Sequence, residues 1–127
     1  MLYTNLKHIE TAEDHARIIS ENENVMVICG RMGPMCIPVY SIAEELVNEY
    51  KNVRFYDMEF DNPHSHVIRS LPEVRGFRGI PFTIYYKKGK VVKATSGIQT
   101  RKQITAILDR EFGPLVHALQ DDGSRAE

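Results

Sequence analysis

Residues 78–92 read RGIPFTIYYKKGKVV and carry the clearest structural signal in the chain. Two apolar runs, Pro81 to Tyr86 and Lys90 to Thr95, flank the short polar link Lys87-Lys88-Gly89. Runs rich in aromatic and β-branched residues on either side of a glycine-containing turn are typical of an antiparallel β-hairpin. We therefore expect two paired strands here, with a proline at the start of the first.

The sequence after the hairpin predicts a closing helix. Thr100 and Gln103 have the spacing of a capping box, in which the two side chains satisfy backbone donors at a helix start. The apolar residues that follow fall on one helical face, and they are Ile104, Ile107, Leu108 and Phe112. Gly113-Pro114 ends this pattern. Residues 115–119 allow one more helical turn, and residues 120–127 are a polar tail that we expect to fray.

Upstream of the hairpin, residues 25–29 (VMVIC) form an unbroken apolar run, which is typical of a strand covered on both faces in the middle of a sheet. A first helix, from a capping-box spacing at Thr11 to about Ser20, precedes this strand. A turn-rich connector follows it. Apolar residues at steps of three and four then predict a long amphipathic helix over residues 39–50.

Apolar and polar residues alternate over residues 53–60, which predicts a second internal strand. Asn62-Pro63 then predicts a turn that leads into a short helix at about residues 64–71. Strands that alternate with helices pair in parallel through right-handed crossovers, whereas the hairpin adds antiparallel strands. The expected fold class is therefore α/β, with a central mixed β-sheet flanked by helices and a C-terminal β-hairpin and helix. We expect a single domain over residues 1–119 and a tail over residues 120–127.

Composition excludes several classes of protein. The chain has 127 residues, with 16 Lys or Arg, 17 Asp or Glu and a formal net charge of −1, so it offers no field that would attract nucleic acid or a membrane surface. Two cysteines cannot build a multi-bridge secreted scaffold. Residues 1–7 lack the apolar core of a secretory signal, and no apolar run approaches the roughly 18 residues of a membrane span. We expect a cytoplasmic protein.

The element order resembles that of the thioredoxin family. Residues 78–83 are similar to the segment in which that family places a cis proline at the start of its hairpin, here Pro81. Residues 85–92 resemble its aromatic, Lys-Gly and Val hairpin, and Gly97 with residues 100–104 matches its glycine kink and last helix. The resemblance covers about residues 25–112 and implies a thioredoxin fold with a cis bond before Pro81. A trans proline opening an edge strand is the alternative.

The turn between the internal strand and the long helix departs from the family pattern. Thioredoxins carry Trp-Cys-Gly-Pro-Cys there, whereas this chain has Arg31-Met32-Gly33-Pro34-Met35-Cys36. Aligned on Gly-Pro, both cysteine positions are methionines, Met32 and Met35, which form neither a thiolate nor a disulfide. Aligned on Cys36, the first cysteine falls on Gly33 and a monothiol remains. A third arrangement pairs Cys36 with Cys29, at the other border of this turn.

The two cysteines are the candidate catalytic residues. Cys36 lies where a helix begins, and unpaired backbone donors there favour a thiolate. A cysteine in the first turn can equally point inward and stay protonated. Cys29 falls on the same strand face as Val25 and Val27, which fits a core position better than a reactive one. A disulfide between them needs Cα atoms about 4.4 to 6.8 Å apart, which the intervening residues can allow.

Two functions follow from these residues. The first is thiol–disulfide exchange on protein thiols, with Cys36 as the attacking thiol and Cys29 as a possible resolving thiol. The second is a redox-inert binding module. In the resembling family the backbone before the cis proline, here Ile80, pairs with an extended peptide segment, and the turn that contains Met32, Gly33, Pro34 and Met35 meets it. Neither function needs a cofactor. His64, His66 and Asp61 share one polar segment without convergent ligands elsewhere, so we expect no metal site.

Overall fold

The computed structural model describes residues 2–113 of the chain. The turn predicted over residues 115–119, the predicted tail over residues 120–127 and the boundary between them lie outside the described residues. No helix within residues 2–113 is both long and apolar enough to cross a membrane.

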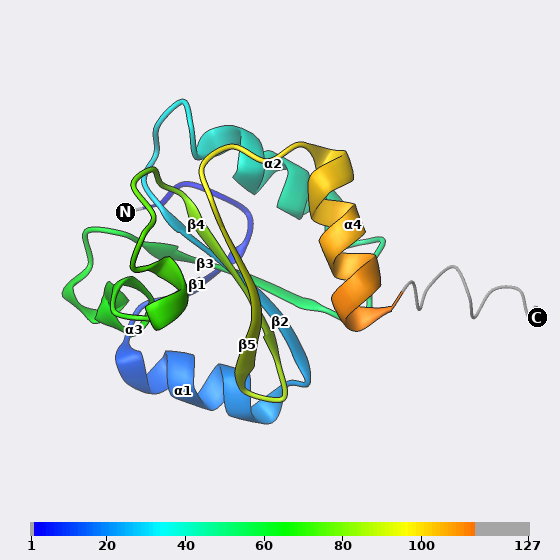
Figure 1. The fold of residues 1–127 in the computed structure, drawn as a ribbon, viewed down its shortest axis with the longest axis horizontal. Helices are drawn as coiled ribbons and strands as arrows, with labels where there is room; N and C mark the ends of the chain where they lie inside the picture. The colour runs from blue at the N-terminus through cyan, green and yellow to red at the C-terminus, as the bar shows by residue number, and fades with distance from the viewer. Residues whose placement is uncertain (1, 114–127) are drawn as a thin grey trace, which may run out of the picture.

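The centre of the structure is a five-stranded mixed sheet with strand order β1-β3-β2-β4-β5 (Figure 1). β1 and β2 pair in parallel with β3, whereas β4 pairs antiparallel with both β2 and β5. The bounds are β1 Lys7–Ile9, β2 Asn24–Gly30, β3 Arg54–Glu59, β4 Phe82–Lys87 and β5 Lys90–Ser96. The predicted fold class and the predicted hairpin are confirmed.

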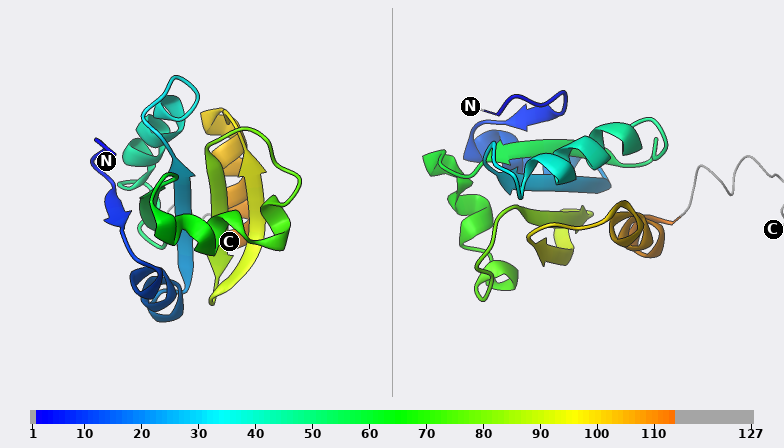
Figure 2. Two further views of the ribbon diagram at one scale, coloured as in Figure 1. Left: turned by 90° about the vertical axis from the view of Figure 1, so that its left-hand side faces the viewer. Right: turned by 90° about the horizontal axis from the view of Figure 1, so that it is seen from above.

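Helices cover both faces of this sheet (Figures 1 and 2). α2 and α4 pack on one face, where their apolar residues join Met26, Ile28 and Tyr85 in one core cluster. α1 and α3 pack on the other face and contribute Ile18 and Ile68 to a second cluster. The bounds are α1 Ala12–Glu21, α2 Ile37–Leu46, α3 His66–Arg69 and α4 Arg101–Phe112, with short 3₁₀ helices at Pro63–Ser65 and Pro72–Val74.

β2 is the central strand that the apolar run predicts. Residues 25–29 are fully buried, and alternate side chains enter the two cores: Met26 and Ile28 on one face, Val25, Val27 and Cys29 on the other. Both helix starts predicted from capping spacings are also present. Thr11 Oγ1 accepts the N–H of Asp14 at 3.0 Å, and α4 begins with a complete capping box.

Three elements differ from the sequence expectations. β1 was not predicted, because it is three residues long and only Ile9 among them is buried, too few to show alternation. α2 begins at Ile37 and ends at Leu46, and Tyr50 is buried from a turn rather than from a helix. The segment over residues 64–71 splits into a 3₁₀ turn and one α-helical turn, since prolines at positions 63 and 72 bound it.

Candidate functional site

The turn between β2 and α2 lies against the residues that precede β4. β2 and β4 are antiparallel neighbours with Cys29 opposite Phe82, so the end of β2 and the start of β4 share one edge of the sheet. Gly30, the last residue of β2, lies at this edge. A Cβ placed on Gly30 would lie 2.8 Å from Cys36 Sγ, 2.8 Å from Tyr40 Oη and 3.2 Å from Pro81 Cβ. The structure therefore brings Cys36 and Pro81 together around a position that only glycine fits.

Hydrogen bonds fix the shape of this turn. The N–H groups of Cys36 and Ile37 both donate to the Gly33 carbonyl at 3.0 Å. Tyr40 Oη donates to the Arg31 carbonyl at 3.1 Å and so ties the start of the turn to α2. Cys36 is the N-cap residue of α2 rather than part of its first turn, since the helix begins at Ile37, and its side chain makes no capping hydrogen bond.

The Arg31 side chain anchors the turn to the end of β3. Its Nε and one terminal nitrogen donate to the two carboxylate oxygens of Asp61 at 2.8 and 2.9 Å. The guanidinium also lies 5.1 Å from the centroid of the Phe60 ring. The Arg31 hydrogen bond holds the pKa of Asp61 below its ordinary value. Arg31 thus occupies, on the Gly-Pro alignment, the place where the resembling family has a tryptophan, and makes a surface ion pair there.

Cys36 is buried, with 1% of its surface exposed. Its Sγ accepts the Arg31 backbone N–H at 3.4 Å. Burial raises the pKa of this thiol, and the smaller opposing effects of that hydrogen bond and of the Arg31 charge do not cancel it. Of the two sequence-based readings of Cys36, the geometry favours the inward-pointing, protonated thiol.

Cys29 is fully buried, and burial raises its pKa to about 12. Its side chain belongs to the core cluster on the α1 and α3 face of the sheet, whereas Cys36 belongs to the cluster on the α2 and α4 face. Both are free thiols. Cys29 therefore has the core position that the alternation of side chains along its strand predicts, and the two cysteines belong to different core clusters.

Besides the Arg31–Asp61 ion pair, the turn and the start of α2 expose apolar side chains. Met32 is 38% exposed, Met35 48% and Ile37 42%. The Pro81 carbonyl accepts the Gly97 N–H at 2.9 Å, and Ile98, the next residue in the chain, is 47% exposed. We call Met32, Met35, Ile37 and Ile98 the apolar rim.

Ile80 lies at this junction as well. Its side chain is half-buried, and its bond to Pro81 is cis. Within residues 2–113 its backbone makes no hydrogen bond, although β4 begins only two residues later. Of the other predicted binding residues, Pro81 is buried, Gly33 is half-buried and Pro34 is exposed. The predicted binding residues therefore lie in two segments, the turn after β2 and the residues before β4, and these segments meet at Gly30 and Pro81.

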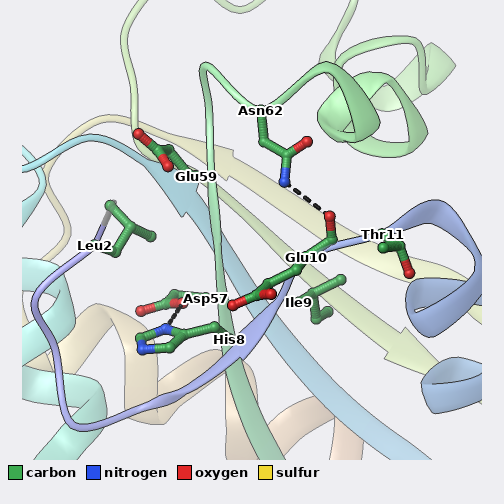
Figure 3. A pocket seen from close by; sticks show the side chains of 8 residues that line it. All are labelled: Leu2, His8, Ile9, Glu10, Thr11, Asp57, Glu59 and Asn62. Carbon is green, nitrogen blue, oxygen red and sulfur yellow. Dashed lines mark hydrogen bonds and ion pairs between the residues drawn. The ribbon is translucent and has the colours of Figure 1, made fainter.

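A separate site, formed by polar residues around Asp57, was not predicted from the sequence. Asp57 on β3 is fully buried and accepts hydrogen bonds from Thr4 Oγ1 at 2.5 Å and His8 Nδ1 at 2.6 Å, at the side of a pocket of about 390 Å³ (Figure 3). Burial raises the pKa of Asp57, and the two hydrogen bonds lower it by a smaller amount. A carboxylate within an apolar strand was the available signal. Among the residues described, no three His, Cys, Asp or Glu side chains are arranged to hold a metal ion.

Comparison with known proteins identifies the fold. No family model and no curated protein matches the sequence. Among solved structures, thioredoxin from Plasmodium falciparum is 22% identical with a TM-score of 0.71, over 84% of this chain and 99% of that one. Chlamydomonas reinhardtii thioredoxin f2 is 14% identical with a TM-score of 0.72, over 87% and 99%. Mitochondrial thioredoxin 3 from Saccharomyces cerevisiae is 17% identical with a TM-score of 0.67, over 82% and 94%. The chain has a thioredoxin fold in which the turn before α2 lacks a Cys-x-x-Cys motif.

Proposed function

We propose that this chain is a redox-inert binding module that holds an extended segment of a partner protein against Ile80 and the apolar rim. One observation carries the proposal: at the junction of the turn with Pro81, both thiols are buried while thioether and aliphatic side chains are exposed. The surface offered to a partner is therefore suited to apolar contact rather than to sulfur exchange.

Buried thiols are poor nucleophiles for two reasons. Disulfide exchange needs a thiolate, and burial raises the pKa of both Cys29 and Cys36. The attacking sulfur must also reach a disulfide in line, and 1% exposure leaves Cys36 Sγ little access to one. Both conditions favour binding over exchange.

The edge at Ile80 supports binding of an extended peptide. A strand-like segment can add to a free backbone edge, where main-chain hydrogen bonds give affinity and neighbouring side chains give specificity. Ile80 provides unpaired backbone, and the apolar rim provides exposed side chains from the turn before α2, from the first residue of α2 and from the segment after β5. Two of the four rim residues are methionines, whose flexible thioethers adapt to different partner side chains. The predicted partner segment is extended and carries apolar side chains.

Selection from a displayed library of random 12-residue peptides tests this proposal. Enriched peptides should bind the parent chain and lose about tenfold or more in affinity for a Met35→Lys variant, because the rim must be desolvated on binding. Val47→Lys is the matched control, since Val47 is similarly exposed, at 40%, at the opposite end of α2. Peptides that bind both variants as well as they bind the parent would refute the proposed surface.

Thiol–disulfide exchange through Cys36 is the second candidate. Its position in contact with the Gly30–Pro81 junction and the Arg31 N–H donated to its sulfur favour it. Mass spectrometry under mild oxidant separates the two functions. Exchange within the chain predicts a loss of two hydrogens from the parent and none from Cys36→Ser, whereas the binding module predicts no loss of hydrogens from either. Cys36→Ala should likewise leave peptide binding intact under our proposal.

A further inference from the structure

We propose that Met35, followed by Met32, is a peroxide-sensitive modification site whose oxidation releases the bound partner segment. The proposal rests on the binding function above and adds a means of regulating it. It assigns to exposed thioethers a redox sensitivity that the buried thiols do not supply.

Exposure divides the sulfur atoms of residues 2–113 into two groups. Cys29, Cys36, Met26 and Met58 have at most 1% of their surface exposed, whereas Met32 has 38% and Met35 has 48%. Every sulfur that an oxidant can reach in the described chain therefore belongs to the rim. The buried methionines are an internal control of the same chemistry.

Chemistry reinforces this division. A thioether reacts with hydrogen peroxide without losing a proton, whereas a thiol reacts as its thiolate. In the reaction, the methionine sulfur attacks one peroxide oxygen, an S–O bond forms and the O–O bond breaks. The sulfur is oxidised by two electrons to the sulfoxide, and the departing hydroxide takes the remaining peroxide proton to leave as water. Hydrogen peroxide is the only co-reactant.

The two rim methionines differ in their surroundings. Met32 Sδ accepts the Tyr3 backbone N–H at 3.3 Å, which engages a sulfur lone pair that would attack the peroxide. The Met35 sulfur makes no hydrogen bond within residues 2–113 and its side chain is the more exposed. We therefore expect Met35 to be oxidised first.

Oxidation changes the rim without changing the fold. Sulfoxide formation converts a flexible apolar side chain into a polar one. Neither Met32 nor Met35 belongs to either core cluster, so the sheet and its helices keep their packing. A partner segment that covers Met35 must then desolvate a sulfoxide oxygen, and we expect its affinity to fall about tenfold.

The experiment oxidises the folded parent chain with hydrogen peroxide at neutral pH and maps each methionine by peptide mass spectrometry. Met35 should gain oxygen first and Met32 second, while Met26, Met58 and both cysteines stay unmodified. The affinity of the library-selected peptides should fall in step with Met35 oxidation and recover after treatment with methionine sulfoxide reductases of both stereospecificities. Earlier oxidation of Cys36 or of a buried methionine would overturn the assignment.

A Met32→Leu, Met35→Leu variant is the matched control, because leucine keeps an apolar rim without sulfur. Whatever affinity this variant has for the peptides before treatment, peroxide should leave that affinity unchanged, whereas the affinity of the parent should fall. If the oxidised parent binds as tightly as the unoxidised parent, the switch is wrong and the binding function stands. If the unoxidised parent enriches no peptide, the binding function itself is refuted, and the switch with it.

Discussion

Replacing Gly30 by alanine tests whether the junction between the turn and Pro81 is as tightly packed as the geometry indicates. The added Cβ would lie 2.8 Å from Cys36 Sγ, 2.8 Å from Tyr40 Oη and 3.2 Å from Pro81 Cβ. None of these atoms can move away easily. Cys36 and Tyr40 are 1% and 2% exposed, Tyr40 Oη is held by the Arg31 carbonyl, and the Pro81 Cβ is part of a ring.

The expected cost follows from that crowding. Adding a methyl group to a close-packed interior costs about 1–3 kcal/mol, because neighbours must leave their preferred rotamers or the backbone must shift. Two contacts at 2.8 Å place Gly30→Ala in the middle of this range, at about 2 kcal/mol. For a domain of this size, the change corresponds to a fall in Tm of roughly 6–10 °C.

Chemical and thermal unfolding of four variants would measure this cost. Gly30→Ala should be destabilised, and the same substitution in a Cys36→Ala background should cost about 1 kcal/mol less, because the sulfur is gone. Gly76→Ala is the matched control: nothing lies within 4 Å of a Cβ at that position. Its stability should equal that of the parent or slightly exceed it. A Gly30→Ala cost that matches Gly76→Ala, or that is independent of Cys36, would refute the packing argument.

Three further predictions concern stability. Thr100→Ala should cost about 1 kcal/mol, since it removes the hydroxyl that accepts the Gln103 N–H at 3.1 Å in the α4 capping box, and urea titration would measure it. Burial lowers the pKa of His15, so as the pH falls through 6.5 the unfolded chain takes up a proton before the folded chain does. The parent should therefore lose stability below pH 6.5, and His15→Gln should lose less. Tm values measured at pH 7.5 and 5.5 would show this difference. Burial raises the pKa of Asp57, so as the pH rises from 3.8 the carboxyl keeps its proton longer in the folded chain than in the unfolded chain. Over that pH range the parent should lose stability relative to Asp57→Asn. Equal pH profiles of stability for the two chains would contradict the burial of this carboxyl.

Local patterns were sufficient to predict most of the fold. The hairpin, the central strand and the α4 capping box each depend on residues at most fourteen positions apart, and all three are present. β1 depends instead on its parallel pairing with β3, nearly fifty positions away, in which Lys7 lies opposite Tyr56. No periodicity within three residues can show such a pairing, and the Asp57 site was missed for the same reason, since its partners are Thr4 and His8.

The position of the candidate site follows from the sequence, whereas the protonation and exposure of its two thiols do not. The place of Cys36 at the start of α2 follows from the Gly-Pro turn. The direction of its side chain depends on Gly30, whose missing Cβ leaves room for the sulfur beside Pro81, some fifty positions later in the sequence. Helix position favours a thiolate and burial favours a thiol, and burial has the larger effect on the pKa of Cys36. Only the tertiary contact decides between them.

The turn keeps its shape through contacts that do not require a reactive sulfur. The Arg31–Asp61 ion pair is about half exposed at both ends, so it contributes little to stability despite its two short hydrogen bonds. The hydrogen bond from the buried Tyr40 hydroxyl to the Arg31 carbonyl is partly shielded from water, and breaking it would leave that hydroxyl without its carbonyl acceptor. Tyr40 therefore holds the turn against α2 more strongly than the ion pair does. The shape of the turn that carries Met32 and Met35 thus depends on a tyrosine and a glycine, so the surface that we propose for binding does not need the Cys-x-x-Cys chemistry.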